Sequence, residues 1–270
     1  MMETPVQNLT ARQQRERDFY SQYSEKYRDE EVVFDPVLGR ERRPWNSYWR
    51  LYEIVQNAFR DPSQRLLDFG CGMGNASMCY AHIGYQVSGF DVCEENLEEC
   101  RRKAERYGFS GRTDFSVQAA EDLSYPDESF DVVAGLDILH HVEVDAALRQ
   151  ARRVLKPGGM AVFREFVEVP VFDVLRNSPL GTRLVSNEPS LDDHRTEDEH
   201  KLNPEQMRMV TSVFPNAELI PYNLLSRVRR FIPNKHPERP SRIERLDQLV
   251  FRTLPFTRRF GGDVIMVLHK

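Results

Sequence analysis

A glycine-rich turn at residues 70–74 carries the clearest chemical signal in the sequence. It reads Gly-Cys-Gly-Met-Gly and follows the short apolar run 65–69. Glycine allows a tight turn after a strand and a close approach of the backbone to a ligand. Asp91 ends the next apolar run, 21 positions after Gly70. A carboxylate at that place can accept hydrogen bonds from both ribose hydroxyls of a nucleoside.

A pair of histidines, His140 and His141, is the second candidate for chemistry. The pair follows the apolar run 130–136, at the place where a parallel strand would end. Ligands of open α/β sheets lie at this edge, and neutral imidazole can accept a proton near neutral pH. One of the two is therefore a candidate general base, with His140 ahead. The alternative is that both pack or cap the structure.

The elements that must position these residues alternate between strand and helix patterns. Strands are expected at 65–69, 85–90, 113–117, 130–136 and 160–166, and helices at 76–83, 94–107 and 143–155. The turn 156–159 (Lys-Pro-Gly-Gly) is expected to end the last of these helices. This alternation predicts a parallel, doubly wound sheet with helices on both faces.

The flanking regions are expected to be mostly helical. The sequence predicts helices at 10–28, 45–59, 204–214 and 241–253, and short strands at 219–220 and 262–269. Thr10 and Gln13 fit a capping box at the first helix. Tyr20, Tyr23 and Tyr27 follow on one face of that helix, which either packs or closes over a ligand. Residues 264–268 are apolar without alternation, as in a strand buried on both faces.

Five ordered motifs then resemble those of a known family. They are Asp68-x-Gly70-x-Gly72-x-Gly74, Asp91, Ala120-Glu121-Asp122-Leu123, Phe130-Asp131-Val132-Val133 and Leu155-Lys156-Pro157-Gly158-Gly159. The chain resembles class I S-adenosylmethionine-dependent methyltransferases, and within them the ubiquinone/menaquinone-type and small-molecule subgroup. The resemblance implies an α/β, Rossmann-like, doubly wound seven-stranded sheet, mostly parallel with an antiparallel last strand, plus helical lid insertions. It also implies a helical cap at 1–60 and a core at 61–270, with lid insertions at about 167–202 and 223–260.

The resemblance further implies a cofactor, S-adenosyl-L-methionine, and a set of residues that bind it. These are Asp68 for loop orientation and the amino group; Gly70, Cys71, Gly72 and Gly74 for the methionine moiety and ribose; Asp91 for the ribose hydroxyls; Val92, Ala120 and Glu121 for the adenine; and Leu136 for backbone contacts near the methionine end. Relatives usually carry an acid that accepts from the adenine N6 just before the third motif. Here that position is Ala119, so Glu121 or a backbone carbonyl is the alternative acceptor.

Composition and charge exclude several classes. Of the 270 residues, 40% are hydrophobic and 29% are charged, which is typical of a globular protein and not of a disordered one. The sequence contains no uninterrupted apolar stretch of membrane-spanning length and no apolar leader in its first 30 residues. The four cysteines lack metal-site spacing, which favours a reducing, cytoplasmic location. The acidic and histidine-containing cluster at 192–200 matches no metal motif, so no metal is expected.

The predicted function is methyl transfer to a small-molecule acceptor, at oxygen or carbon, with an apolar or lipid-like natural product as one class. Residues 223–260 hold ten basic and three acidic residues, in a chain whose net charge is −5. This stretch is either a solvated face or a contact for a membrane surface or a phosphorylated substrate. A nucleic-acid methyltransferase using it is the alternative, disfavoured because 135–138 lacks the sequence that recognises base amino groups. A non-catalytic cofactor-binding module remains open, and Asn75 argues against a nicotinamide dehydrogenase.

Overall fold

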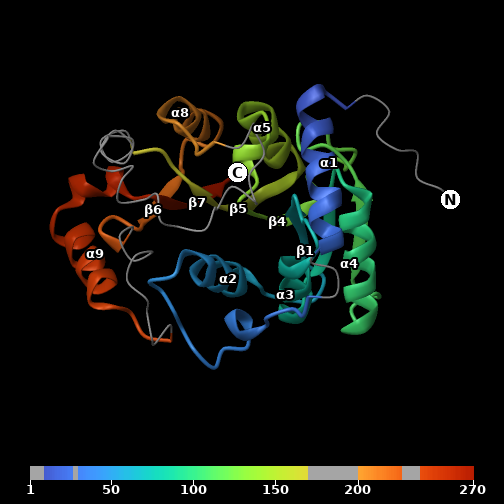
Figure 1. Cartoon of the computed structure of the whole chain (residues 1–270), viewed down its shortest axis with the longest axis horizontal. Helices are drawn as coiled ribbons and strands as arrows, with labels where there is room; N and C mark the ends of the chain where they lie inside the picture. Colours follow the sequence, from blue (N-terminus) through green and yellow to red (C-terminus); the bar gives the residue numbers. More distant parts are fainter. Residues whose placement is uncertain (1–8, 27–29, 170–199, 227–237) are drawn as a thin grey trace.

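The computed structural model describes residues 9–26, 30–169, 200–226 and 238–270 (Figure 1). The strands are β1 (Arg65–Phe69), β2 (Gln86–Asp91), β3 (Thr113–Val117), β4 (Phe130–Leu136), β5 (Leu155–Phe166), β6 (Glu218–Tyr222) and β7 (Asp263–His269). The helices are α1 (Ala11–Lys26), α2 (Ser47–Ala58), α3 (Asn75–Ile83), α4 (Glu94–Arg106), α5 (Val144–Val154), α8 (Pro204–Val213) and α9 (Arg242–Thr253). Short 3-10 turns lie at Asp35–Val37, Leu139–His141 and Pro255–Phe260.

The strands form one seven-stranded sheet in the order β3-β2-β1-β4-β5-β7-β6. All neighbouring pairs are parallel except those of β7, which is antiparallel to both β5 and β6. The predicted doubly wound sheet with an antiparallel last strand is confirmed. Asp263 of β7 lies opposite both Phe166 and Tyr222, so β5 and β6 end at the same edge of the sheet.

Helices cover both faces of the sheet, and each face has its own apolar core. Leucines 66 and 67 of β1 point to opposite faces, as the alternation of a strand requires. One core contains α2, α3 and α4, and the other contains α5 and α8. Residues 264–268 of β7 alternate between the two cores and are all buried, which explains their unbroken apolar run.

Several local expectations are confirmed and one is corrected. Thr10 and Gln13 exchange the two hydrogen bonds of a capping box at α1. The turn expected at 156–159 is instead part of β5, which begins directly after α5 at Leu155. A register shift between Phe130 and Val132 of β4 takes up the Pro-Gly-Gly residues, so the strand continues through them.

The two expected lid insertions are described only in part. Of residues 167–202, the structure describes 167–169 and 200–202, and the acidic cluster at 192–199 lies outside the described residues. Of residues 223–260, all but 227–237 are described. Within the described ranges, no helix is long and apolar enough to cross a bilayer, and no His, Cys, Asp and Glu cluster is placed to hold a metal ion.

Candidate active site at the carboxyl edge of the sheet

The glycine loop joins β1 to α3 and has the left-handed backbone that its glycines permit. The φ angles are +73° at Gly70, +49° at Gly72 and +79° at Gly74. A Cβ atom at Gly70 would lie 2.5 Å from the Ile138 side chain, and one at Gly74 would lie 2.8 Å from the Cys100 Sγ. At Gly72 no atom lies within 4 Å of that position. The loop is therefore closely packed at its two ends and open at its middle glycine, where a ligand can approach the backbone.

Asp91 ends β2 and its half-buried carboxylate faces the glycine loop. Its Oδ2 accepts from the Gly72 N–H at 3.0 Å, and its Oδ1 accepts from the Cys93 N–H at 2.9 Å and the Asn96 amide at 3.2 Å. Burial raises the pKa of Asp91, although these three hydrogen bonds oppose the shift. Asp91 thus braces both the loop and the start of α4, and a carboxylate lies at the place expected for a ribose contact.

Asp68 lies behind the loop rather than on its open side. Its side chain is buried, and its Oδ2 accepts from the Ser77 hydroxyl of α3 at 2.5 Å. Burial raises the pKa of Asp68 to about 7, against the lowering effect of Ser77. This contact ties β1 to α3 and so fixes the two ends of the glycine loop. Cys71 is also buried, with its Sγ 3.9 Å from the Cys100 Sγ.

The residues expected along the adenine lie after β2 and β3. Ala119 and Ala120 are buried, and Val92 is half-buried. Glu121 has a partner on each carboxylate oxygen: Oε2 accepts from the Gln13 amide at 2.8 Å, and Oε1 accepts from the Glu143 N–H at 3.0 Å. Each Glu121 oxygen thus accepts one hydrogen bond and keeps a lone pair that could accept from an adenine N6.

His140 is buried at the end of β4 and is held by a glutamate that the sequence analysis did not identify. Its Nδ1 lies 2.6 Å from Oε2 of Glu165, a fully buried residue of β5. The other oxygen of Glu165 accepts from the backbone N–H groups of Ile138 at 2.8 Å and Leu139 at 2.6 Å. Glu165 therefore holds both the start of this turn and the orientation of the His140 ring.

His141 lies against α1, and its ring centroid is 4.1 Å from that of His140. Its Nδ1 lies 3.0 Å from the Glu16 carboxylate, and its Nε2 lies 3.3 Å from the Tyr20 hydroxyl. The two neighbouring histidines therefore have different surroundings: β5 for His140 and α1 for His141. Tyr20 contributes to the contact between α1 and the core, while the side chain of Tyr23 and all of Tyr27 lie outside the described part of the chain.

Helix α1 lies across the carboxyl edge of the central strands, beside α4 (Figure 1). In addition to the contacts of Gln13 and Tyr20, the Arg12 guanidinium donates to the backbone oxygen of His140 at 3.0 Å. Leu136, the last residue of β4, is half-buried at this edge. The segments after β3 and β4 are thus bridged by one N-terminal helix.

A buried arginine lies next to Glu165 on β5, and the sequence analysis missed it as well. Arg164 is 2% exposed and pairs with Asp137 and with Asp263, the latter at 2.6 Å. Its guanidinium stacks on Tyr48 at 4.3 Å and on Phe166 at 3.9 Å from the ring centroids. Burial lowers the pKa of Arg164, but the two aspartates outweigh it and raise the pKa. The arginine therefore stays charged inside the protein.

Asp137 extends this network to the protein surface. Its backbone has a φ of +54°, which is costly for a residue with a side chain. Its Oδ2 accepts from the hydroxyl of Tyr48, a residue of α2, at 2.6 Å. Burial and Asp137 raise the pKa of Tyr48 well above its ordinary value. In the sequence, the sign of this network is a pair of charged residues, Arg164 and Glu165, within the apolar run of β5.

Comparisons with known proteins agree with this arrangement. A family model described as a methyltransferase domain matches residues 67–163. The matched residues run from β1 to β5 and carry the five ordered motifs, so this part of the chain is similar to methyltransferase domains.

The chain is similar to several curated methyltransferases over this domain. It is 39% identical over 108 residues to 27-O-demethylrifamycin SV methyltransferase of Amycolatopsis mediterranei, covering 39% of this chain and 40% of the relative. It is 40% identical over 99 residues to the ubiquinone biosynthesis O-methyltransferase of Cereibacter sphaeroides, covering 36% of this chain and 39% of the relative. The chain thus spans about two fifths of the length of these relatives.

Solved structures share the fold over nearly the whole chain. Geranyl diphosphate C-methyltransferase from Streptomyces coelicolor A3(2) has a TM-score of 0.58 at 13% identity, covering 97% of this chain and 98% of that one. The [4+2]-cyclase SpnF has a TM-score of 0.56 at 22% identity, covering 93% and 96%. At these sequence identities the similarity is one of fold alone. It covers more of the chain than the residues 67–163 that the family model matches.

Proposed function

We propose that this chain transfers a methyl group from S-adenosylmethionine to a small-molecule acceptor, at oxygen or carbon. The single observation that carries the proposal is the glycine loop with three left-handed glycines, open at Gly72 and faced by the Asp91 carboxylate. This combination fits a nucleoside, because it offers an open approach to the backbone at Gly72 and a strand-end acid. The curated relatives, which are named as O-methyltransferases, support it.

Each cofactor contact is proposed for the residue that the motifs assign. Asp91 would accept from the ribose hydroxyls, and Gly72 would allow the ligand to approach. Asp68, placed behind the loop, would act mainly through Ser77 by holding the loop in shape. Ala120 and Val92 would border the adenine. Glu121 or a backbone carbonyl is proposed for the N6 contact, because each Glu121 oxygen accepts one hydrogen bond and can accept another.

When bound, the cofactor would supply an electrophilic methyl group on a sulfonium sulfur. Displacement at that methyl requires in-line approach of the acceptor, so the residues around it contribute mainly by positioning. His140 is proposed as the base that removes a proton from a hydroxyl or activated carbon acceptor, through Nε2, the ring nitrogen that Glu165 does not contact. Glu165 would stabilise the imidazolium that forms.

The N-terminal residues are proposed to form a cap over this edge of the sheet. Helix α1 already contacts Glu121 and both histidines, and Tyr48 of α2 contacts Asp137. The insertions around 167–202 and 223–260 are proposed to complete a lid on the acceptor side. The acceptor class proposed is an apolar or lipid-like small molecule, as the sequence analysis expected.

Two measurements test the proposed function. Calorimetry with S-adenosylmethionine and with NAD should show binding of the first and none of the second. Methyl-labelled cofactor incubated with host extract should then deliver label to a small organic-soluble fraction. Label in nucleic acid would favour the alternative methyltransferase class, and tight binding without any transfer would favour a non-catalytic module. Failure to bind S-adenosylmethionine would refute the proposal.

A further inference from the structure

Helix α9 is oriented opposite to an ordinary surface helix. Its acidic residues Glu244 and Asp247 are buried, at 6% and 4% exposure, while Leu246 and Leu249 are 46% and 56% exposed. A surface helix normally turns its apolar stripe inward and its charges to solvent. Leu246 and Leu249 are one helical turn apart, so both lie on the solvent side of α9. Neighbouring exposed apolar side chains are typical of a contact surface.

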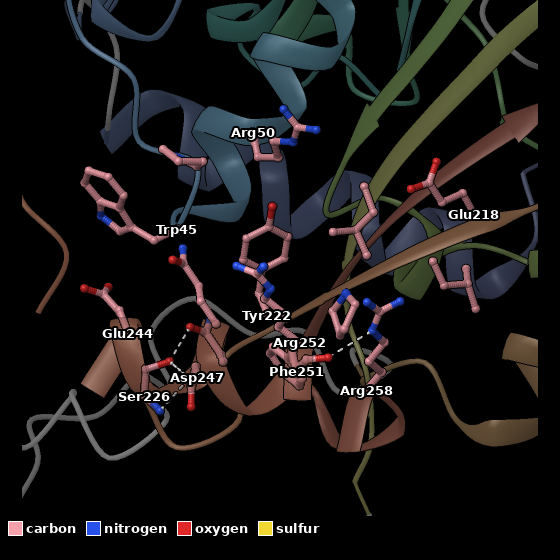
Figure 2. A pocket seen from close by; sticks show the side chains of 16 residues that line it. Trp45, Arg50, Glu218, Tyr222, Ser226, Glu244, Asp247, Phe251, Arg252 and Arg258 are labelled. Atoms are coloured by element: carbon pink, nitrogen blue, oxygen red, sulfur yellow. Dashed lines mark hydrogen bonds between the residues drawn. The ribbon is translucent and has the colours of Figure 1, made fainter. Parts of the chain in front are cut away.

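The inward polar face of α9 explains why the helix keeps this orientation. It lines a cavity of about 380 Å³ between β6, α9 and the residues before α2, to which Trp45, Tyr222 and Phe251 contribute (Figure 2). Asp247 accepts from three consecutive N–H groups after β6, at Leu224, Leu225 and Ser226, and from the Ser226 hydroxyl at 2.6 Å. Rotating the leucines inward would leave these donors buried and unpaired, at considerable cost.

Glu244 fixes the start of the helix in the same way. It exchanges the hydrogen bonds of a capping box with Ser241, at 2.7 and 3.2 Å. Both acids of α9 are thus used for internal hydrogen bonds, and neither is available to balance charge on the outer side. The outward face is therefore apolar and basic, and its orientation is set by buried polar contacts.

The outer surface combines leucines with arginines. We define the α9 face as Leu246 and Leu249 together with the exposed arginines 242 and 245. The segment that follows carries exposed Leu254 and Phe256, at 46% and 61%, and the exposed Arg259. Apolar side chains flanked by arginine suit the boundary between lipid headgroups and acyl chains, where each leucine leaves water and each guanidinium meets phosphate.

We propose that the α9 face binds the surface of a lipid bilayer that contains anionic lipid. Charge decides between occupants: a second copy would bring two sets of arginines together, whereas an anionic bilayer complements both the arginines and the leucines. The proposal does not rest on methyl transfer, because it follows from the orientation of α9 alone.

The inward side of α9 is connected to the carboxyl edge of the sheet where the proposed acceptor site lies. The Ser226 hydroxyl that contacts Asp247 also contacts Asn223, and Asn223 donates to Asp263 at 2.6 Å. Asp263 in turn pairs with Arg164. A chain of hydrogen bonds therefore joins the inward side of the helix to the buried arginine.

Vesicle co-sedimentation tests the proposal. The full chain should bind vesicles of phosphatidylcholine mixed with phosphatidylglycerol, and bind phosphatidylcholine alone at least about tenfold more weakly. Leu246→Gln with Leu249→Gln should weaken binding by about tenfold or more, because two side chains no longer leave water. Val33→Gln, at an exposed valine outside this helix, is the apolar control and should bind like the unchanged protein.

A charge variant separates the two contributions. Arg242→Gln with Arg245→Gln should lower affinity for anionic vesicles and leave the weak binding to neutral ones unchanged, with Arg208→Gln on α8 as control. Equal binding to both vesicle types, or full binding by the leucine variant, would overturn the proposal.

The proposal would also be overturned if the protein bound no lipid and formed a dimer that the leucine variant abolishes, since the occupant would then be a second copy. A loss of thermal stability in the leucine variant, with no lipid binding by either protein, would mean that the chain covers this face itself.

Discussion

The two halves of the candidate site are built in different ways. On the β1–β2 side, the backbone forms the site: three left-handed glycines and one strand-end acid, Asp91, bonded to Gly72. On the β4–β5 side, side chains form it through contacts between distant parts of the chain, such as Tyr48 with Asp137 and Arg164 with Asp263, 89 and 99 residues apart. The first kind of site leaves a pattern in the sequence, because only glycine adopts such a backbone freely. The second kind of site leaves no such pattern, because its hydrogen-bonding partners can come from any part of the chain that the fold brings close.

The largest effect should come from the side-chain half. His140→Ala should lower kcat by about 100- to 10,000-fold while cofactor affinity stays nearly unchanged, because a positioned base acts in the transition state and not in cofactor binding. Steady-state kinetics with the true acceptor and calorimetry with S-adenosylhomocysteine measure the two effects. The rate of the unchanged enzyme should rise with pH as the imidazole loses its proton.

His141→Ala is the matched control for this prediction. His141 contacts Glu16 and Tyr20 of α1, so its loss should loosen that helix and lower thermal stability more than turnover. If His140→Ala retains a rate like that of the unchanged enzyme, no base is needed and the acceptor is methylated by positioning alone.

Glu165→Gln should separate positioning from proton transfer. The amide keeps an oxygen for the N–H groups of Ile138 and Leu139. It removes the negative charge beside the His140 ring and turns an amide donor toward Nδ1, which favours the tautomer with the proton on Nε2. Losing that charge destabilises the imidazolium, so the pH–rate profile should move to lower pH and kcat should fall by about tenfold or more. A lower kcat with an unmoved profile would contradict this role and leave Glu165 as a purely structural residue.

In the backbone half, Asp91→Ala should weaken cofactor binding by about 2–4 kcal/mol, because two charge-assisted hydrogen bonds to ribose would be lost. Calorimetry gives the affinity directly. Asn96→Ala is the control, because it removes one donor to Asp91 and keeps the carboxylate. Equal losses in the two variants would mean that Asp91 acts only by bracing α4.

The difference between the backbone half and the side-chain half of the site also explains which of its residues the sequence could predict. The order of strands and helices, the glycine loop, Asp91 and the histidine pair were all predictable, because alternation and glycine spacing reflect backbone geometry. Arg164 and Glu165 were not, because in sequence they merely interrupt an apolar strand. Their meaning depends on Asp137, Asp263 and His140, which only the folded sheet brings beside them.

The orientation of α9 was not predictable for a related reason. Its sequence is amphipathic, and the ordinary expectation places Leu246 and Leu249 inward. The buried position of Asp247 is determined by three N–H groups after β6, a contact 21 to 23 residues away in the chain. The periodicity of the sequence predicts that α9 has an apolar face and a polar face. The hydrogen-bond partners of the polar face determine which of the two is buried.

Asp68 allows a smaller test in the backbone half through pH. Its pKa is about 7 in the folded protein against an ordinary value of 3.8, because burial disfavours the charge. The folded state therefore holds a proton that the unfolded state has lost, so stability should fall as pH rises from about 4 to about 7. Asp68→Asn should remove this dependence and stabilise the ligand-free protein by roughly 1–3 kcal/mol near pH 8.

Urea unfolding near pH 5 and near pH 8 measures the difference. The gap between Asp68→Asn and the unchanged protein should widen toward the higher pH. A constant gap would mean that the carboxylate of Asp68 stays charged throughout this range. Ser77→Ala, which removes the hydroxyl donor, should act in the opposite direction and destabilise the protein most where Asp68 is charged.

The smallest effect is expected at Tyr48, where the two halves of the site can be compared by matched changes. Tyr48→Phe removes the hydroxyl that donates to Asp137 and keeps the ring that stacks on Arg164. The side chain is partly exposed, so the free energy of unfolding should fall by only about 0.5–1.5 kcal/mol. Tyr125→Phe removes a comparable hydroxyl contact, with Ser116 of β3, and should cost about as much. If the side-chain half positions the acceptor, only Tyr48→Phe should also raise KM for the acceptor, while both variants keep cofactor affinity. Equal KM values in the two variants would confine the role of Tyr48 to structure, since both would then have lost a hydrogen bond and nothing more.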